Sequence, residues 1–276
     1  MKIIDGKALA AKMRAELKDK ISELKKDVGL AVIIVGEDPA SQIYVRNKIK
    51  ACAEVGIRSF SYELPATATQ AEVEGLIETL VEDDKIHGIL LQLPLPRGLD
   101  AVSALKKIPP EKDVDGFSAE NLGKLAAKED CIVACTPFGV MKMLESENIP
   151  LAGKNAVVLG RSTTVGKPMS MLLLNADATV TTCHSKTENI TEICRRADIL
   201  VAAIGKAKFV TADMVKEGAV VVDVGMNRDE NGKLCGDVDY ENVKDKCSYI
   251  TPVPGGVGPM TITMLMYNTY LAALKE

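Results

Sequence analysis

The sequence predicts an α/β protein of two domains, an N-terminal three-layer domain and a C-terminal doubly wound domain, each built on a parallel sheet. Short apolar runs rich in β-branched residues alternate with segments whose apolar residues recur every three or four positions. This alternation is typical of parallel strands covered by helices on both faces. The chain has 276 residues, enough for two hydrophobic cores. A helix expected at residues 136–147 separates two series of strands, so we expect it to join the domains.

The composition favours small-molecule partners over nucleic acid or a membrane. Lys and Arg number 34 and Asp and Glu 38, a net charge of −4 without a basic block or an acidic tail. The seven cysteines form no C-x-x-C pair and only two histidines could join them, so we expect no metal site and reduced thiols. The first residues are charged too early for a signal peptide, and no apolar run approaches the roughly 20 residues of a membrane span. The sequence therefore predicts a cytoplasmic protein.

The first domain is expected to begin with an amphipathic helix, whose apolar residues are Leu9, Met13, Leu17, Ile21 and Leu24. Three strands follow, at residues 30–35, 58–64 and 88–93. Ser41 is expected to cap the helix between the first two strands, which ends near Val55. The next helix is opened by the capping box Thr69-Gln70-Ala71-Glu72. Such an order gives a parallel sheet that binds ligands beyond the carboxyl ends of its strands.

The second domain is expected to follow the joining helix, for which Thr136 and Pro137 would be the N-cap and the first helical residue. Its strands are predicted at residues 156–160, 178–183, 199–204 and 219–224. Asn231-Gly232 marks a hairpin turn, and a loop rich in Gly and Pro at 251–261 precedes a final helix that should pack on the first domain. The expected bounds are 1–136 plus 260–276 for the first domain and 137–259 for the second.

The first strand of the second domain ends in a glycine turn that opens into a helix. Its pattern is Gly160-x-Ser162-x-x-Val165-Gly166, which departs from G-x-G-x-x-G at the second and third glycines. The strand, turn and helix are nevertheless in the order of a Rossmann-like unit, where backbone N–H groups and the helix dipole point at a phosphate. The turn therefore predicts a nucleotide site.

The next strand indicates which nucleotide binds. It ends in His184-Ser185-Lys186, where an NAD site would have an acidic residue for the ribose 2′-hydroxyl. Arg161 and Ser185, with Lys186, instead offer cationic and hydroxyl donors to a 2′-phosphate, which favours NADP. The alternative interpretation is that Arg161 and Lys186 are solvated surface charges of an ordinary βαβ unit.

The first domain contains a second set of candidate residues. Tyr44 and Lys48 are four positions apart and share one face of their helix, although a packed tyrosine and an exposed lysine would have the same spacing. Gln92 is a polar residue in an apolar strand, so its amide needs hydrogen-bond partners, and Lys48 is a candidate. Asp115 lies on a turn at the edge of the sheet, where simple turn chemistry is the alternative.

Motifs from both halves of the chain together resemble one family. They are Tyr44-x-x-x-Lys48, Gln92-Leu93-Pro94-Leu95-Pro96, Lys112-Asp113-Val114-Asp115-Gly116, Cys135-Thr136-Pro137, Gly160-Arg161-Ser162, Cys183-His184-Ser185 and Pro252-Val253-Pro254-Gly255-Gly256-Val257-Gly258-Pro259-Met260-Thr261. In order and spacing they resemble the bifunctional methylenetetrahydrofolate dehydrogenase/methenyltetrahydrofolate cyclohydrolases. The resemblance implies a folate-binding catalytic domain, a Rossmann-like NADP-binding domain, a cleft between them and a homodimer. It also implies oxidation of 5,10-methylenetetrahydrofolate with NADP, followed by hydrolysis of the methenyl product to 10-formyltetrahydrofolate.

The resemblance also assigns roles to residues of this sequence. Lys48 would serve the hydrolysis, Gln92 would orient Lys48, and Asp115 would bind the pterin ring. Tyr44 would stack on the folate, with Pro254 and Gly255 near the folate and the nicotinamide. The residues implied at the NADP site are Thr136, Gly160, Arg161, Ser162, Ser185, Met226 and Thr261.

Two other functions remain open on the residues alone. A monofunctional NAD(P)-dependent dehydrogenase could use Tyr44 and Lys48 as a catalytic pair, as short-chain dehydrogenases do, but there the pair follows the nucleotide turn, whereas here it precedes Gly160. A non-catalytic NADP-sensing protein would use the same glycine turn and would leave Gln92 and Lys48 without a chemical role.

Overall fold

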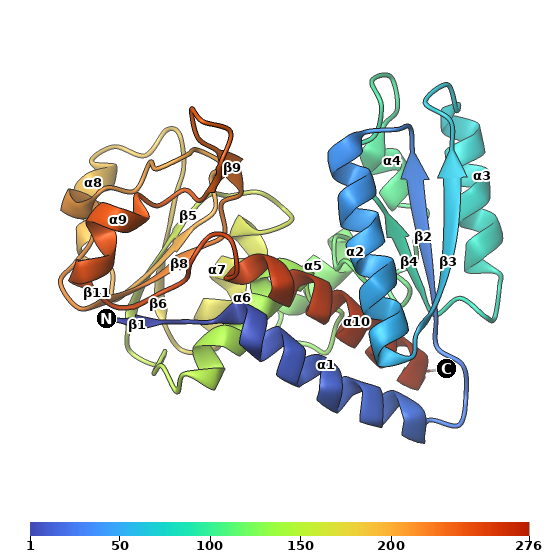
Figure 1. Ribbon diagram of the computed structural model, residues 1–276, viewed down its shortest axis with the longest axis horizontal. Coiled ribbons are helices and arrows are strands. Elements are labelled where there is room, and N and C mark those ends of the chain that lie inside the picture. Colours follow the sequence, from blue (N-terminus) through green and yellow to red (C-terminus); the bar gives the residue numbers. More distant parts are fainter. Residues whose placement is uncertain (276) are drawn as a thin grey trace. The chain divides into compact units, whose positions relative to one another are not determined.

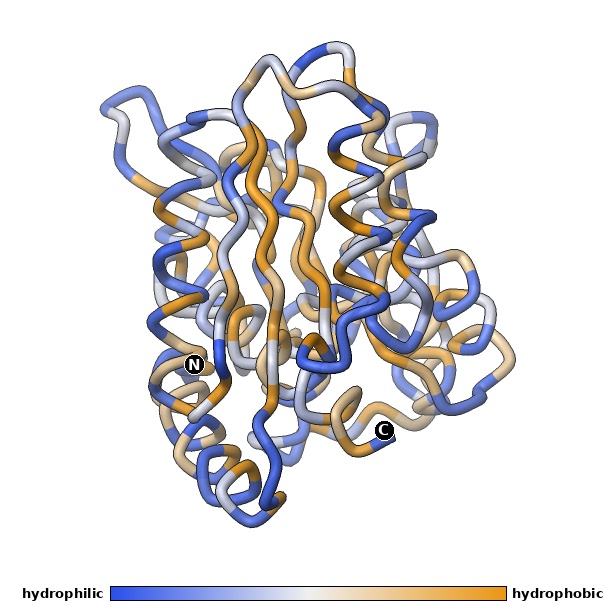
Figure 2. The backbone as a smooth tube through the Cα atoms, turned by 90° about the vertical axis from the view of Figure 1, so that its right-hand side faces the viewer, coloured by the Kyte–Doolittle hydropathy of each residue, from blue (hydrophilic) through white to orange (hydrophobic). Residues whose placement is uncertain are grey.

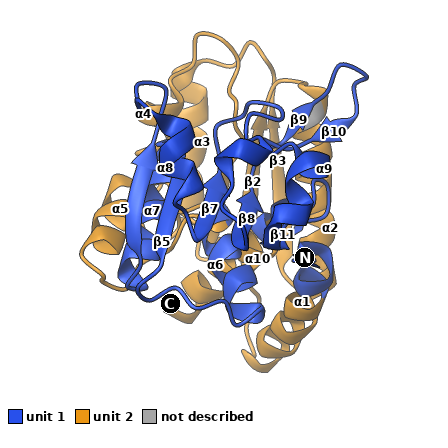
Figure 3. Cartoon of the chain, turned by 90° about the vertical axis from the view of Figure 1, so that its left-hand side faces the viewer, with its two compact units in different colours: residues 1–11, 136–261 blue, residues 12–135, 262–276 orange. Residues whose placement is uncertain are grey.

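Two units make up the computed structural model, which describes residues 1–275 and is coloured by unit in Figure 3. Unit 1 contains residues 1–11 and 136–261, and unit 2 contains residues 12–135 and the segment from Ile262 onward. The chain passes between the units within α1 (Gly6–Glu23), at Cys135, and within α10 (Val257–Lys275). Each unit has its own parallel sheet, so the α/β fold with two parallel sheets predicted from the sequence is confirmed.

Unit 2 is built on a three-stranded parallel sheet in the order β3-β2-β4 (Figure 1). The strands are β2 (Gly29–Val35), β3 (Arg58–Leu64) and β4 (Gly88–Leu91). β2 and β4 are buried along their whole length, and Figure 2 shows the strands in the middle of the view as mainly hydrophobic. The predicted strand 88–93 is two residues too long, since the chain enters Leu93-Pro94, where proline has no N–H for the ladder.

Helices cover both faces of the unit 2 sheet. One face packs against α3 (Gln70–Val81) and α4 (Ala101–Leu105) through residues Ala31, Ile33, Val35, Val73, Ile77, Leu80 and Ala104. The helix α2 (Pro39–Val55) contacts β2 and β3, and α5 (Ala119–Ala126) follows the loop after α4. The predicted cap of α2 was wrong: Asp38 accepts a hydrogen bond from the Ser41 N–H at 2.7 Å. Pro39 occupies the first turn, where its missing N–H costs nothing.

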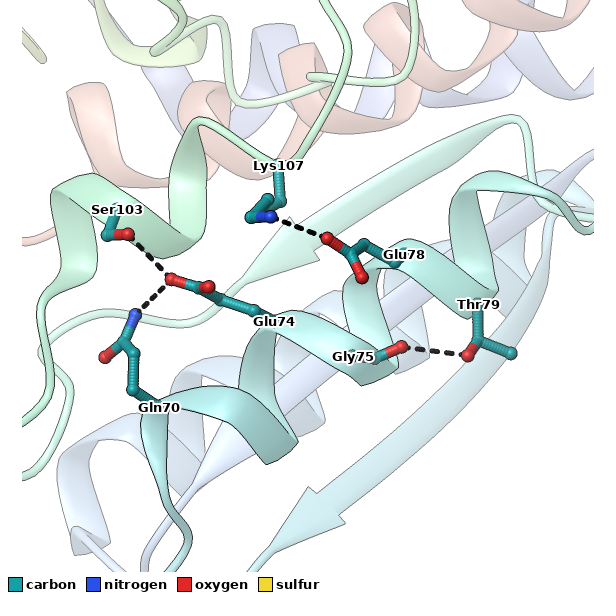
Figure 4. Close-up of polar contacts among 7 residues, drawn as sticks. All are labelled: Gln70, Glu74, Gly75, Glu78, Thr79, Ser103 and Lys107. Carbon is teal, nitrogen blue, oxygen red and sulfur yellow. Dashed lines mark hydrogen bonds and ion pairs between the residues drawn. The ribbon is translucent and has the colours of Figure 1, made fainter.

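Polar contacts fix the start of α3 and join it to α4. The predicted capping box is present, because Thr69 Oγ1 accepts from the Glu72 N–H and Glu72 Oε2 accepts from the Thr69 N–H at 2.7 Å. Farther along the helix, Gln70 and Ser103 both donate to Glu74, at 2.6 and 2.7 Å (Figure 4). Ser103 belongs to α4, so the Glu74 carboxylate joins α4 to α3.

Unit 1 contains six parallel strands in the order β1-β11-β8-β7-β5-β6. Their bounds are β1 (Lys2–Ile3), β5 (Asn155–Leu159), β6 (Thr179–Cys183), β7 (Ile199–Ala202), β8 (Ala219–Asp223) and β11 (Cys247–Ile250). The order changes direction at β5, which has β6 on one side and β7 on the other. In such doubly wound sheets the ligand crevice lies at the carboxyl ends of the strands, where the order reverses.

The remaining elements of unit 1 connect or extend this sheet. They are α6 (Cys135–Ser146), α7 (Gly166–Asn175), α8 (Ile190–Arg195), η1 (Ala212–Met214), α9 (Tyr240–Val243), η2 (Lys244–Lys246) and the hairpin β9 (Asn227–Arg228) with β10 (Leu234–Cys235). The predicted hairpin turn is present, with Gly232 at φ 74°. The predicted N-cap Thr136 was wrong, because α6 already begins at Cys135. Pro137 is tolerated there because the first N–H groups of a helix have no partner within it.

The final helix begins earlier than the sequence suggests. The predicted loop 251–261 ends at Gly256, and Gly258 and Pro259 lie in the first turn of α10. From Ile262 onward the helix belongs to unit 2, where Met266 Sδ lies 3.4 Å from Cys52 Sγ. The prediction that this helix packs on the N-terminal domain is confirmed for that part.

The capping box gives a stability prediction. Thr69→Ala removes the side-chain acceptor of the Glu72 N–H, so the free energy of unfolding should fall by about 1 kcal/mol. Urea unfolding followed by circular dichroism measures it. Thr67→Ala, in the exposed loop just before the box, is the matched control and should change stability by only a few tenths of a kcal/mol. Equal effects of the two substitutions would contradict the assigned cap.

Candidate active site

A lysine and a glutamine form the first polar pair of unit 2. Lys48, on α2, donates from Nζ to Gln92 Oε1 at 3.0 Å, which is the contact proposed from the sequence. Gln92 comes directly after β4 and donates from Nε2 to the Leu93 carbonyl at 2.7 Å. The second hydrogen bond fixes the amide, so its oxygen points at the lysine. Tyr44 lies one helical turn before Lys48 and is 38% exposed.

The segment that carries Asp115 runs beside the same strand. The Ile89 N–H donates to the Lys112 carbonyl at 2.8 Å, which continues the sheet past β4. Lys112 is buried and its Nζ donates to the Val81 carbonyl at the end of α3, at 2.9 Å. Gly116 has φ +72°, and a Cβ there would lie 2.4 Å from the Ala134 nitrogen. The strand, the buried lysine and the glycine therefore place Asp115 next to residues 133–135.

An asparagine of α10 holds this loop from the other side. Asn268 is fully buried and donates from Nδ2 to the carbonyls of Val114 and Val133, at 2.9 and 2.8 Å. The Cys135 thiol donates to the Val114 carbonyl at 3.2 Å, and the Cys135 N–H to the Asp115 carbonyl at 3.3 Å. Asn268 was not predicted from the sequence. Its signal is a polar residue in a strongly apolar helix, where a buried amide must have partners.

Charge links Asp115 to the lysine pair. Burial raises the pKa of the Asp115 carboxyl to about 6, while the positive charge of Lys48 acts in the opposite direction. Burial holds the pKa of the Cys135 thiol well above its usual value, and the negative charge of Asp115 is the second largest cause. Lys48, Gln92 and Asp115 therefore belong to one polar cluster at the carboxyl end of the unit 2 sheet.

The glycine turn of unit 1 is tighter than its sequence suggests. Gly160 has φ +118°, and a Cβ on it would lie 2.2 Å from the Ala203 carbonyl oxygen. A Cβ on Gly166 would lie 2.2 Å from the Gly160 carbonyl oxygen. Gly166 therefore allows the close helix–strand contact that the third glycine of the usual fingerprint provides, one position later in the chain. The sequence reasoning missed this role.

Ser162 changes the expectation that this turn points free N–H groups at a phosphate. Its hydroxyl oxygen accepts from the N–H groups of Val165 and Gly166, at 3.1 and 3.2 Å. These amides at the start of α7 are therefore bound by the protein's own side chain. An anion would have to displace the Ser162 hydroxyl to reach these two amides.

Arg161 and Ser185 lie at the same edge of the unit 1 sheet. Their strands pair with Leu159 opposite Cys183, so each of the two residues comes two positions after this pair. Both are exposed. The structure thus places a guanidinium and a hydroxyl beyond the carboxyl ends of neighbouring strands, beside the point where the strand order reverses.

The other residues proposed for the nucleotide or the folate also lie in unit 1. Thr136 Oγ1 and Thr261 Oγ1 are 3.0 Å apart, on α6 and α10. Met226 follows β8 and is 49% exposed. Pro254 is exposed, and the Gly255 carbonyl accepts from the Lys7 N–H at 3.0 Å. The candidate residues therefore form two groups, one in each unit.

Within residues 1–275, no group of three or more His, Cys, Asp or Glu side chains could hold a metal ion. No helix in that part of the chain is long and apolar enough to cross a membrane.

The fold and the two groups define a nucleotide-binding α/β enzyme with a separate substrate-binding unit. Residues 4–115 match the family Tetrahydrofolate dehydrogenase/cyclohydrolase, catalytic domain, and residues 134–276 match the corresponding NAD(P)-binding domain. The chain therefore belongs to the tetrahydrofolate dehydrogenase/cyclohydrolase family, as its motifs suggest.

Individual relatives are similar over nearly their full length. The bifunctional protein FolD of Campylobacter concisus is 59% identical over 276 residues, which cover 99% of this chain and 98% of the relative. The bifunctional enzyme from Campylobacter jejuni superposes with a TM-score of 0.98 at 52% identity, covering 100% of this chain and 99% of that one. The Trypanosoma brucei enzyme, solved with NADP and an inhibitor, has a TM-score of 0.94 at 42% identity, with 99% and 97% covered.

The raised pKa of Asp115 makes stability depend on pH. The folded chain binds this proton more tightly than the unfolded chain, so the contribution of Asp115 to stability falls as pH rises from about 4 to about 6. Asp115→Asn removes this loss. The free energy of unfolding of the variant relative to the unsubstituted chain should increase by roughly 2 to 3 kcal/mol between pH 4 and pH 7.

Urea unfolding at pH 4, 5, 6 and 7 measures this difference. Asp223, whose pKa burial also raises to about 6, is present in both proteins and cancels in the comparison. A difference between the two proteins that stays constant across this pH range would mean that Asp115 is not held in the environment described.

Proposed function

We propose that the chain is a bifunctional enzyme of folate one-carbon metabolism. It oxidises 5,10-methylenetetrahydrofolate to 5,10-methenyltetrahydrofolate with NADP, and it hydrolyses the methenyl compound to 10-formyltetrahydrofolate. The observation that carries this proposal is the cluster in which Gln92 holds the Lys48 amine at 3.0 Å and the charge of Lys48 acts on Asp115. Family membership over both domains supports it.

The two reactions place different demands on the protein. In the oxidation, hydride leaves a carbon flanked by two nitrogens, and the product is a resonance-stabilised amidinium cation. No proton is removed in that step, so the protein contributes by positioning the substrate. Bound NADP supplies the hydride acceptor. This step therefore needs no catalytic base among the residues of the chain.

The hydrolysis requires a group that takes a proton. Water adds to the amidinium carbon, which forms a C–O bond, and the oxygen then loses a proton. Lys48 is the group assigned to this proton, and the Gln92 amide orients it through the bond from Nζ. The adduct's hydroxyl group then gives up its remaining proton as one C–N bond breaks and that nitrogen takes up a proton, which gives the formyl product. The assignment uses the lysine in the hydrolysis alone.

Asp115 is assigned to the pterin ring. A carboxylate pairs through two hydrogen bonds with an aminopyrimidinone edge, and with a pKa of about 6 it is ionised at neutral pH. Tyr44 offers an exposed ring on the same helix face as Lys48 and is assigned to stacking on the folate. Pro254 and Gly255 are assigned to the folate and the nicotinamide.

The NADP site is assigned to the carboxyl edge of the unit 1 sheet. Arg161 and Ser185 are proposed to bind the 2′-phosphate, because a guanidinium pairs strongly with a phosphate and the strand pairing puts both residues at one edge. The other proposed lining residues are Thr136, Gly160, Ser162, Met226 and Thr261. In domain terms, residues 1–136 plus 260–276 would bind folate and 137–259 would bind NADP.

The proposal extends to a homodimer in the cytoplasm. β3 pairs only with β2 among residues 1–275, so this seven-residue strand offers an open edge for contact with a second copy. The near balance of charge, −4 overall, favours neither nucleic acid nor a membrane surface as a partner.

Substitution of the lysine tests the division of labour. Lys48→Met should abolish hydrolysis of methenyltetrahydrofolate while part of the hydride transfer survives, since only hydrolysis removes a proton. Formation of reduced nicotinamide from NADP and methylenetetrahydrofolate measures the first activity, and loss of methenyl absorbance measures the second.

Lys50→Met is the matched control, because Lys50 is exposed on the same helix, and both activities should persist. Absence of reduced nicotinamide with the unsubstituted chain, with either NADP or NAD, would refute the enzyme proposal itself. Equal loss of both activities in Lys48→Met would refute the role of the lysine.

Arg161 gives the test of cofactor choice. Arg161→Ala should raise the KM for NADP by at least about tenfold and leave the KM for NAD nearly unchanged, because only NADP has the 2′-phosphate. Steady-state kinetics with both cofactors measure the ratio. Arg196→Ala, at an exposed arginine of the same unit, should change neither value. If Arg161→Ala weakens both cofactors equally, the residue does not contact the 2′-phosphate.

A further inference from the structure

Asp237 is a buried carboxylate outside the residues assigned above. Its side chain has no exposed surface. Oδ2 accepts from the N–H groups of Ile204 and Gly205, at 2.7 and 3.0 Å. Oδ1 accepts from the Lys206 N–H at 2.8 Å and from Asn227 Nδ2 at 2.9 Å. All four partners are donors, so the group is a saturated acceptor.

Three successive N–H groups converge on this side chain because of the loop that follows β7. Gly205 has φ +67°, and the turn it makes directs the amides of residues 204–206 to one point. Such a concave arrangement of N–H groups binds anions. Here the protein fills it with its own carboxylate, which also explains why β7 ends at Ala202 instead of reaching Ile204 as predicted.

A second buried carboxylate holds Asp237 in place. Asp223, at the end of β8, accepts from the N–H groups of Gly225, Asp237 and Val238, each at 2.9 Å. The contact is close: a Cβ on Gly236 would lie 1.8 Å from Asp223 Oδ2. Asp223 therefore holds segments 223–225 and 236–238 together. This contact fixes the backbone from which the Asp237 side chain extends to the loop after β7.

The elements that Asp237 joins are those that border the nucleotide site. The loop 204–206 lies at the carboxyl end of β7, the neighbour of β5 where the strand order reverses. Asn227 directly follows Met226, which is proposed to line the site. The Asp237 carboxylate thus fixes both the loop next to the glycine turn and the segment that carries Met226. Both of its oxygens accept hydrogen bonds from the protein itself.

We propose that Asp237 is a positioning residue for the nicotinamide nucleotide, acting through the loop 204–206 and through Asn227. The inference rests on the proposed NADP-dependent oxidation. It predicts that weakening this carboxylate impairs the binding of NADP in particular and leaves the hydrolysis, which needs no nucleotide, unaffected.

Asp237→Asn tests the inference. An amide in place of the carboxylate turns an NH₂ group toward two of the four donors, so the loop loses part of its support. The KM for NADP should rise about tenfold, and kcat at saturating NADP should stay close to that of the unsubstituted enzyme. The rate of hydrolysis of methenyltetrahydrofolate, assayed without nucleotide, should stay within about twofold of the unsubstituted enzyme.

Two controls separate positioning from general weakening of the unit. Asp239→Asn makes the same chemical change at a partly exposed carboxylate that accepts a hydrogen bond from the Asn242 side chain, and it should leave the KM unchanged. Val243→Ala creates a cavity in the same core and should lower the melting temperature without raising the KM for NADP. A comparable rise in KM in Val243→Ala would overturn the inference.

Asn227→Ala keeps the inference testable if Asp237→Asn does not fold. It removes one of the four donors and leaves the carboxylate in place, so the dissociation constant of NADP, measured by calorimetry, should rise about threefold. An unchanged constant in this variant, or an unchanged KM in Asp237→Asn, refutes the inference. Loss of NADP-dependent oxidation in the unsubstituted chain would instead refute the proposed function.

Discussion

Burial of a carboxylate costs much free energy unless N–H groups donate hydrogen bonds to it, and this constraint organises both units. Asp113 accepts from the Ser118 N–H and from Asn121, which anchors the loop that leads to Asp115. Asp223 and Asp237 do the same in unit 1, each with at least three donors. Asp223 and Asp237 join segments that are distant in sequence near the carboxyl ends of β7 and β8, where the candidate nucleotide site lies.

Asp115 differs from these three in a way that bears on its role. Its neighbours Val114 and Gly116 are held through their backbones, and burial raises the pKa of the Asp115 carboxyl to about 6. The positive charge of Lys48 is the main influence that lowers this pKa. A group held in place but incompletely satisfied is suited to a ligand that brings its own hydrogen-bond donors.

Much of the fold could be predicted because apolar patterns are local. The strand 58–64 and the capping box at Thr69 are where the pattern indicates. Helix starts were less certain, because Ser41 and Thr136 are good caps by type while Asp38 with Pro39, and a start at Cys135, fit the backbone better. Lys48 and Gln92 were paired correctly because a polar residue beside an apolar strand demands a partner. Asn268 and Asp237 were not predicted, since most of their partners are backbone groups more than 30 residues away, which no side-chain pattern reveals.

The hydroxyl of Ser162 has a consequence for how strongly a phosphate can be held at the glycine turn. A phosphate oxygen that reaches the N–H groups of Val165 and Gly166 replaces an acceptor that is already there, so the number of hydrogen bonds to these amides does not increase. The gain comes from the negative charge of the incoming oxygen and from cationic side chains nearby. A phosphate bound at these amides would exchange one acceptor for another, and the strength of such binding would depend on ionic strength more than at a turn with open amides.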